Sequence, residues 1–382
     1  MDPGAAQATL ANWRTAPFNR WGFQHVRELV PSADIANDPE GVSPLPAARE
    51  DLSALEIEPG TDLARFLEVT DTDALVVLRR GRIVFEHYAN GMSAHTPHIL
   101  MSVSKSMLGL LAGILSGRGA LDVARRVTDY VPELARTAYA GASVRQLLDM
   151  RAGIAFDEDY LATSGPIIAY RKATNWNPLG PGESASDLRS FFATLTQADG
   201  AHGGRFHYVS PNTDLLGWVI ERAAGARYAD LMSELLWRPM GAERSAYVTV
   251  DRLGASRVAG GMCTTARDLA RVGQLLVEGG RGVVPAGWIE DIATRGDAAA
   301  WAAGSFAAYY PGLEMHYRSK WYVVRGRAPL LFAMGIHGQN LFVDRARGVV
   351  IAKFSSQAAP IDEARIALTT RAVERLREAL DA

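Results

Sequence analysis

The chain has 382 residues, of which 48% are hydrophobic and 21% are charged, and its formal net charge is -2. A chain of this size can bury a large core and form about two or three domains, or one elaborate domain. The near-neutral charge gives no broad basic field for nucleic acid or for an anionic membrane, so neither is expected as a partner.

The single cysteine, Cys263, excludes an intrachain disulfide and a cysteine-based zinc site, which fits a reducing compartment. The N-terminal stretch MDPGAAQATLANWRTAPFNRW has no cationic segment leading into an apolar one, so no secretory signal is indicated. No stretch reaches about 18 uninterrupted apolar residues, and no membrane-spanning helix is expected. These features favour a soluble, cytoplasmic protein.

Residues 1–70 are predicted to form an N-terminal arm and a first helix. Within them, residues 31–60 are rich in Pro, Ser and Asp, which indicates a surface arm without regular elements. A β-hairpin is expected next, because apolar runs at 75–78 and 83–85 flank Arg80-Gly81. A glycine at this place can take the positive φ of a tight turn.

Between about residues 102 and 300, apolar residues recur at helical spacing, as in SVRQLLDM, TDLLGWVIERAAG and TARDLARVGQLLVEGG. After about residue 315, β-branched and aromatic runs return at 321–324, 341–343 and 349–351. The final segment, PIDEARIALTTRAVERLREALDA, has the apolar face of a helix packed on a sheet.

This order predicts an α/β (α+β) fold with an antiparallel sheet built from both chain ends. Residues 71–100 plus 301–382 are expected to form the sheet domain, which the C-terminal helix covers. Residues 101–300 are expected to form a mainly helical domain that carries the candidate nucleophile and a tyrosine.

The stretch MSVSKSMLG, residues 101–109, places three serines around Lys105, one of only four lysines. If a helix starts near Ser102, Ser102 and Lys105 share one face, whereas Ser104 and Ser106 point away from Lys105. A serine in the first turn also lies beside unpaired backbone N–H groups, where an oxyanion can be stabilised. Ser102 is therefore the candidate nucleophile; the alternative is that it only caps the helix.

A serine hydroxyl needs a base, and Lys105 can act as one only if burial or a partner lowers its pKa. Tyr208, in GGRFHYVSPNTD just before a helical pattern, is the candidate second ionisable group. We expect the Lys105 ammonium to favour the Tyr208 phenolate.

With these residues, the chain resembles the serine β-lactamase and penicillin-binding superfamily, class C branch. Tyr208-x-Ser210 stands where the family has Tyr-x-Asn or Tyr-x-Ser. SVRQLLDM and GGMCTTARDLARVGQLLVEGG also resemble family segments, so the likeness spans about residues 70 to 382. Within the superfamily, NRWGFQHVRELVPSADI, ILMSVSKS, DEDY and GIHGQNLFVD resemble the 6-aminohexanoate-dimer hydrolases, which are related to family carboxylesterases.

The resemblance implies an acyl-enzyme mechanism without a cofactor. Ser102 would attack, Lys105 and Tyr208 would move protons, and the N–H groups of Ser102 and Ile336 would bind the oxyanion. The substrate-binding positions that we predict are Tyr160, Arg171, Trp176, Ser210, Ala259, Trp321 and His337.

Several of these positions have plainer interpretations. Tyr160 matches a tyrosine near the substrate amide but could be a loop aromatic packed on the surface. Trp176 matches a lid tryptophan, and Trp321 could join an aromatic groove, although tryptophan is more often a core residue. His337 either lines the pocket or is a strand-end histidine bonded to backbone.

Two departures from the family limit what the resemblance implies. The Lys-Thr-Gly strand is here Ala333-Met334-Gly335, so the cation that receives a β-lactam carboxylate is missing. Arg171 stands where an efficient dimer hydrolase has an aspartate for the substrate amine, and Ala259 replaces an asparagine. Weak β-lactamase activity and weak turnover of the nylon dimer are expected.

The sequence thus predicts a serine hydrolase of linear amides or esters, similar to 6-aminohexanoate-dimer hydrolases. The alternatives are a carboxylesterase or D-amino-acid amidase of the same superfamily, or a non-catalytic penicillin-recognising-like sensor. A small amide or ester is the expected partner, and a homodimer is left open. No metal is expected, because no carboxylate completes a zinc site with His95 and His98.

Overall fold

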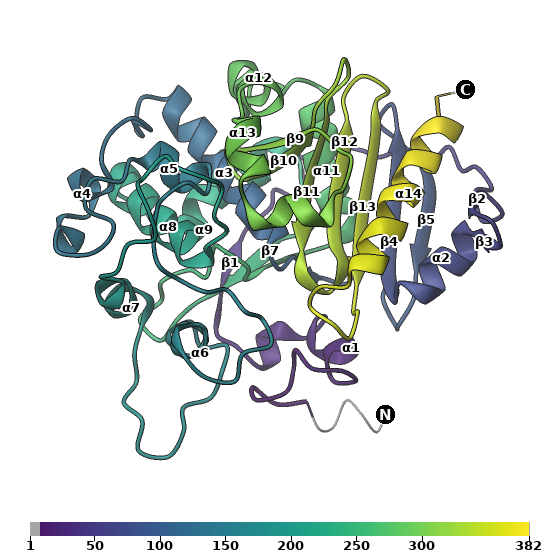
Figure 1. The fold of residues 1–382 in the computed structure, drawn as a ribbon. Coiled ribbons are helices and arrows are strands. Elements are labelled where there is room, and N and C mark those ends of the chain that lie inside the picture. Colours follow the sequence, from purple (N-terminus) through teal and green to yellow (C-terminus); the bar gives the residue numbers. More distant parts are fainter. Residues whose placement is uncertain (1–7, 382) are drawn as a thin grey trace.

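A computed structural model describes residues 8–381 and contains a large antiparallel sheet (Figure 1). Both chain ends contribute strands to it, as the sequence predicts. Its strands lie in the order β5 (Arg82–Tyr88), β4 (Thr72–Arg79), β13 (Val349–Ser355), β12 (Gln339–Asp344), β11 (Leu330–Gly335), β10 (Trp321–Val324) and β9 (Met315–Arg318).

Helices cover both faces of this sheet. Val76 and Leu78 of β4 point into a core shared with α3 (Val103–Gly117) and α11 (Ala266–Val277). Leu75 and Val77 point to the opposite face, where α2 (Leu63–Val69) and α14 (Glu363–Ala379) pack (Figure 1). The central strands are apolar on both sides because each face is covered.

Most of the remaining helices lie in the segment of the chain between β5 and β9. They are α4 (Val127–Tyr130), α5 (Val144–Leu148), α6 (Pro166–Ala173), α7 (Leu188–Thr194), α8 (Ser210–Ala224), α9 (Tyr228–Met232), α10 (Arg238–Met240), α12 (Ala286–Thr294) and α13 (Ala298–Ala302), with α1 (Asn19–Gly22) near the N-terminus. Short helical turns are η2 (Val26–Glu28), η3 (Pro132–Leu134), η4 (Ser233–Trp237), η5 (Ser305–Tyr309) and η6 (Ile336–Gly338). No helix within residues 8–381 is both long and apolar enough to cross a membrane.

The predicted hairpin is confirmed. Arg80 and Gly81 join β4 to β5 with φ of 49° and 75°, so both central residues of the turn are left-handed. This conformation matches the twist of the flanking strands, and glycine adopts it without a steric cost.

The prediction that residues 31–60 lack regular elements is wrong. β1 (Ser32–Ile35) pairs with β7 (Ala246–Thr249) in a second sheet of order β1-β7-β8-β6, with β8 (Met262–Thr264) and β6 (His98–Ile99). β2 (Glu56–Glu58) pairs with β3 (Thr61–Asp62). A strand of four residues shows little alternation, and its partner lies about 200 residues away, so local composition does not reveal it. The division into residues 1–70, residues 71–100 plus 301–382, and residues 101–300 stays a prediction.

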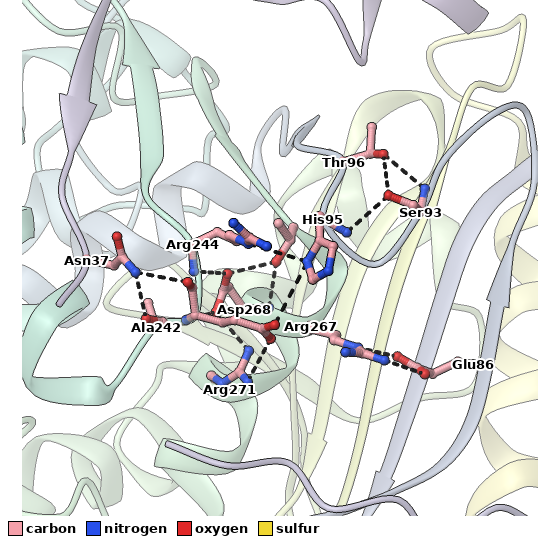
Figure 2. A network of polar contacts seen from close by, with 12 residues as sticks. Asn37, Glu86, Ser93, His95, Thr96, Ala242, Arg244, Arg267, Asp268 and Arg271 are labelled. Carbon is pink, nitrogen blue, oxygen red and sulfur yellow. Dashed lines mark hydrogen bonds and ion pairs between the residues drawn. The ribbon is translucent and has the colours of Figure 1, made fainter. Parts of the chain in front are cut away.

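A polar network fixes the start of α11 (Figure 2). The buried Asp268 carboxylate accepts hydrogen bonds from the N–H groups of Glu243 and Arg244 at 2.7 and 3.1 Å. It also pairs with Arg271 at 2.9 Å, while Arg267 holds Glu86 of β5 through two bonds of 2.6 and 2.9 Å. A buried carboxylate needs such donors. The Asp268 contacts tie the helix to the loop before residue 246, and the Arg267 contact ties it to the large sheet.

The two histidines that precede the Ser-Lys motif have separate structural roles. His95 lies in an exposed loop, where its Nδ1 accepts a bond from Arg244 (Figure 2). His98 is fully buried in β6, 3.3 Å from Asp73, and stacks on Phe354. Among the residues that the structure describes, no group of three His, Cys, Asp or Glu side chains is placed to hold a metal ion.

Candidate active site

Ser102 lies at the N-terminal end of the buried helix α3, which begins at Val103. Its side chain makes no capping hydrogen bond to the helix backbone, so it is not merely an N-cap. Instead, its Oγ accepts a hydrogen bond from Lys105 Nζ at 2.8 Å. Met101, just before it, has φ of 45°, an uncommon conformation for a non-glycine residue that often marks functional sites.

The two neighbouring serines point elsewhere. Ser104 Oγ accepts a bond from the N–H of Met262 at 3.2 Å, and Ser106 Oγ donates to the carbonyl of Lys320 at 2.7 Å. Both side chains are buried and engaged in packing contacts. Of the three serines, Ser102 alone faces Lys105 and a pocket.

Lys105 is almost fully buried, and its ammonium group has few polar partners. Besides Ser102, Nζ donates to the carbonyl of Ala259 at 2.7 Å. Burial lowers the pKa of Lys105 to about 7; Glu158 and Asp214 oppose the shift, and Arg257 adds to it. In a large share of the molecules the Lys105 amine is therefore neutral near pH 7, and a neutral amine can accept a proton.

Tyr208 lies in the extended segment just before α8, with its ring centre 4.9 Å from Lys105 Nζ. Burial and the charge of Glu158 raise the pKa of the Tyr208 hydroxyl above its ordinary value, and hydrogen bonds to Ser102 and Tyr322 only partly oppose this. This direction contradicts the expected phenolate, because the burial of Tyr208 outweighs the interactions that would lower its pKa. Tyr208 stays a phenol.

Glu158 is a site residue that the sequence analysis missed. One of its oxygens accepts the Ser210 hydroxyl and the Tyr160 hydroxyl, the latter at 3.0 Å. The other accepts the N–H of Ser210, at the start of α8. Glu158 thus holds the Tyr160 loop against α8, next to Tyr208. The acidic run before Tyr160 in DEDY is the only sequence signal for it.

A buried ion pair supports the backbone that contacts Lys105. Asp214 of α8 accepts the N–H of Ala259 at 2.8 Å and also bonds to Arg257 and to the Tyr170 hydroxyl. The Ala259 carbonyl, in turn, accepts from Lys105. No sequence signal distinguishes Asp214 from any other carboxylate near the start of a helix, so this network was also missed.

Gly335 brings the end of β11 against the start of α3. A Cβ at this position would lie 2.7 Å from the Leu100 carbonyl oxygen and 2.9 Å from the Ser102 nitrogen. Only glycine permits this approach, which sets the backbone of Ile336 beside Ser102. Two backbone N–H groups at such a corner can stabilise a developing oxyanion.

Ser102 lies between two pockets, both of which Tyr160 and Ile336 also line. The first, which we call the aromatic pocket, has a volume of about 630 Å³ including its open side, and its lining includes Tyr208, Phe306, Tyr310, Tyr322, Met334 and Phe342. The second, which we call the arginine pocket, has a volume of about 420 Å³ including its open side. Its lining includes Arg14, Arg171, Arg257, Glu158, Trp176 and Ser210.

Five of the predicted substrate-binding residues line the arginine pocket: Tyr160, Arg171, Trp176, Ser210 and Ala259. Trp176 is buried against Trp13, and its indole N–H donates to Thr249 at 3.1 Å. Arg171, on α6, donates to the carbonyl of Tyr160 at 3.0 Å. The structure therefore brings these side chains to one side of Ser102.

Trp321 and His337 do not line either pocket. Trp321 is fully buried between the large sheet and the helices, and because side chains alternate along β10, its neighbour Tyr322 reaches the aromatic pocket instead. The buried His337 donates from Nδ1 to the Gln357 carbonyl at 2.7 Å and lines a surface depression that adjoins the arginine pocket. Burial lowers the pKa of His337 to about 4, so its ring is neutral.

Comparison with known proteins agrees with this fold. Residues 64–375 match the model of the β-lactamase family. A 6-aminohexanoate-dimer hydrolase from Paenarthrobacter ureafaciens is 39% identical over 364 residues, which cover 94% of this chain and 91% of that protein.

Solved structures of other proteins have a similar fold. One from Bacillus anthracis, provisionally named as a 6-aminohexanoate-dimer hydrolase, has a TM-score of 0.89 and 26% identity, covering 100% of this chain and 99% of that one. A D-stereospecific amidohydrolase from Streptomyces shares the fold, with a TM-score of 0.58, 17% identity, and coverage of 80% and 98%.

The fold is that of the serine hydrolases that have a β-lactamase/transpeptidase-like architecture. The chain belongs to the β-lactamase family, and the relatives found here include 6-aminohexanoate-dimer hydrolases.

Proposed function

We propose that this protein hydrolyses linear amides or esters through an acyl-enzyme on Ser102. The observation that carries the proposal is the 2.8 Å hydrogen bond between Lys105 Nζ and Ser102 Oγ, made by an amine whose pKa burial lowers to about 7. At neutral pH such a lysine can take the serine proton as attack begins.

In the acylation step, Ser102 Oγ bonds to the substrate carbonyl carbon and its proton passes to Lys105. The carbonyl oxygen becomes negative and is stabilised by the N–H groups of Ser102 and Ile336. The bond to the leaving amine or alcohol then breaks as the leaving atom receives a proton from Tyr208, which Lys105 reprotonates. A protonated phenol is suited to this donor role, and the raised pKa of Tyr208 supports it.

In the second step, a water molecule attacks the acyl-enzyme and gives its proton to the same pair of residues. Ser102 leaves as the alcohol, and a carboxylic acid is released. Deacylation thus repeats the first step with water in place of serine, and neither step requires a cofactor or a metal.

Linear substrates are supported by the two pockets that open on either side of Ser102. The relative from Paenarthrobacter ureafaciens is a 6-aminohexanoate-dimer hydrolase, and we extend its class of linear amide substrate to this chain. Ala333-Met334-Gly335 offers no cation for the carboxylate of a β-lactam, so cephalosporins should be poor substrates.

A slowly acylating sensor is the rival interpretation. A sensor does not need a group that activates water, yet Lys105 and Tyr208 are both present and lie beside Ser102. The retained proton-transfer pair therefore favours an enzyme over a sensor.

A substrate panel tests the proposal. A short-chain nitrophenyl ester, the aminohexanoate dimer, a chromogenic cephalosporin and a D-amino-acid amide are assayed with the wild type and with Ser102→Ala. We expect turnover of the ester or a linear amide that Ser102→Ala abolishes. A stoichiometric burst without turnover would instead identify a sensor, and equal rates for both proteins would refute the assignment of Ser102.

We further propose a cytoplasmic location, because the single cysteine fits a reducing compartment, and leave a homodimer open. Size-exclusion chromatography with light scattering measures the mass in solution, and the result decides between one and two copies.

A further inference from the structure

The arginine pocket contains three guanidinium groups, those of Arg14, Arg171 and Arg257. Glu158 is the only carboxylate among the described residues that line it. This arrangement is unusual, because buried or half-buried charges are ordinarily paired. The guanidinium groups that have no ion-pair partner indicate which kind of ligand the pocket binds.

Two of the four charged groups already have strong partners within the protein. Arg257 pairs with Asp214 in a buried contact, and its guanidinium also lies 4.3 Å from the ring centre of Tyr170. The carboxylate of Glu158 accepts the N–H and hydroxyl of Ser210 and the hydroxyl of Tyr160. Arg257 therefore has its charged partner in Asp214, although its Nε is buried without a hydrogen-bond partner, and the carboxylate of Glu158 is held by three donors.

Arg14 and Arg171 are different, since neither forms an ion pair within residues 8–381. Arg171 donates to the Tyr160 carbonyl at 3.0 Å. Arg14 donates to the Trp176 carbonyl at 3.5 Å and to the Asn177 side chain, while its Nε is buried without a partner. A guanidinium has five donors, so both groups keep donors for a bound molecule.

The electrostatics of this pair agree with the geometry. Burial and the neighbouring charges of Arg171 and Arg257 lower the pKa of Arg14 to about 9. Burial and Arg257 also lower the pKa of Arg171, with partial relief from Glu158. Like charges held together in this way are stabilised by an anion, and two guanidinium groups suit a carboxylate.

The position of Tyr208 indicates which half of the substrate meets these arginines. Tyr208 lines the aromatic pocket and not the arginine pocket. In the proposed function the leaving group takes its proton from Tyr208, so it must face the aromatic pocket. The acyl chain then extends into the arginine pocket.

We infer that the acyl chain of the preferred substrate ends in a carboxylate that Arg14 and Arg171 bind, so that the substrates are linear monoesters or monoamides of dicarboxylic acids. The inference rests on the proposed function. The reaction consumes one water molecule and releases a dicarboxylate with an alcohol or an amine, and it needs no other reactant.

Three nitrophenyl esters of equal acyl length test this inference: the adipate monoester, the hexanoate ester and the 6-aminohexanoate ester. They differ only in the end group, which is anionic, neutral or cationic. We expect kcat/KM to be at least about tenfold higher for the adipate monoester than for the hexanoate ester, the size of a charge-assisted hydrogen bond. The 6-aminohexanoate ester should be the slowest.

Variants then assign the effect to the two arginines. Arg14→Gln and Arg171→Gln should each lower the ratio of kcat/KM for adipate monoester over hexanoate ester about tenfold. Arg118→Gln, which makes the same charge change at an exposed position just after α3, should leave this ratio unchanged. Inhibition by free adipate should weaken in the same two variants, which gives a second measurement if either loses stability.

The outcomes separate the two proposals. If the hexanoate ester reacts faster than the adipate monoester, or if the Arg171→Gln ratio stays at the wild-type value, the carboxylate site is refuted while the hydrolase stands. If Ser102→Ala hydrolyses all three esters at the wild-type rate, the proposed function itself fails.

Discussion

Asp214 and Lys105 are connected through a single residue: the Asp214 carboxylate accepts the N–H of Ala259 at 2.8 Å, and the carbonyl of Ala259 accepts Lys105 Nζ at 2.7 Å. The carboxylate therefore acts on the amine in two ways. It fixes the carbonyl that orients the amine, and its charge favours the ammonium form.

Asp214→Asn should move the pH dependence of activity. Without the negative charge the pKa of Lys105 falls below its value of about 7, so the rise of kcat/KM with pH should shift to lower pH. The variant should also lose about 3 to 5 kcal/mol of stability, because Arg257 is left as an unpaired buried charge. Tyr170→Phe is the control, since it removes the two hydrogen bonds of the Tyr170 hydroxyl, to Asp214 and from Arg257, but keeps the ion pair. An unshifted pH profile in a folded variant would contradict the coupling.

Ser102 should form the covalent adduct with a fluorophosphonate, because Ser104 and Ser106 are buried and bonded elsewhere. Intact mass followed by peptide mapping identifies the labelled residue. Ser106→Ala serves as the matched control and should still be labelled. An adduct retained in Ser102→Ala would assign the nucleophile to another residue.

Lys105→Ala and Tyr208→Phe should each lower kcat/KM by about 10²- to 10⁴-fold, the usual contribution of general acid–base groups. The double variant should lose much less than the product of the two, since they form one proton-transfer unit. In the wild type, kcat/KM should rise as pH increases through about 7, because only the neutral amine of Lys105 accepts a proton. A Tyr208→Phe rate within threefold of the wild type would remove the tyrosine from the mechanism.

Arg171→Asp should improve turnover of the aminohexanoate dimer. The dimer carries an ammonium group, which Arg171 repels and a carboxylate would attract, so kcat/KM should rise about tenfold or more. The hexanoate nitrophenyl ester, which has no charge, is measured beside it. If the ratio of the two rates stays unchanged, the acyl end of the dimer does not reach Arg171.

Gly109→Ala should destabilise the protein by about 1 to 3 kcal/mol, the usual cost of overpacking. Its Cβ would lie 2.1 Å from the Ser319 carbonyl, where the β9–β10 turn packs on α3. Gly287→Ala, in α12, is the control, because a Cβ there meets nothing within 4 Å and alanine favours a helix by about 0.5 to 1 kcal/mol. Urea denaturation measures both; equal midpoints for the two variants would contradict the close approach.

Much of the fold follows from local patterns in the sequence. The Arg80-Gly81 turn and the apolar runs on either side predict the first hairpin, and periodicity predicts α8, α11 and α14. The same reasoning places Ser102 and Lys105 on one helix face, because residues three apart are neighbours on any α-helix. These relationships depend on backbone geometry over a few residues, so the sequence by itself determines them.

The tertiary structure decided the rest, since burial and charge depend on residues that are distant in the chain. Lys105 has its lowered pKa because helices and loops exclude water from it, and for the same reason Tyr208 stays protonated. Glu158, Asp214 and Arg14 reach the site only after folding. Local patterns carry no information on long-range contacts of this kind, and those contacts set the charge of each group and therefore its chemistry.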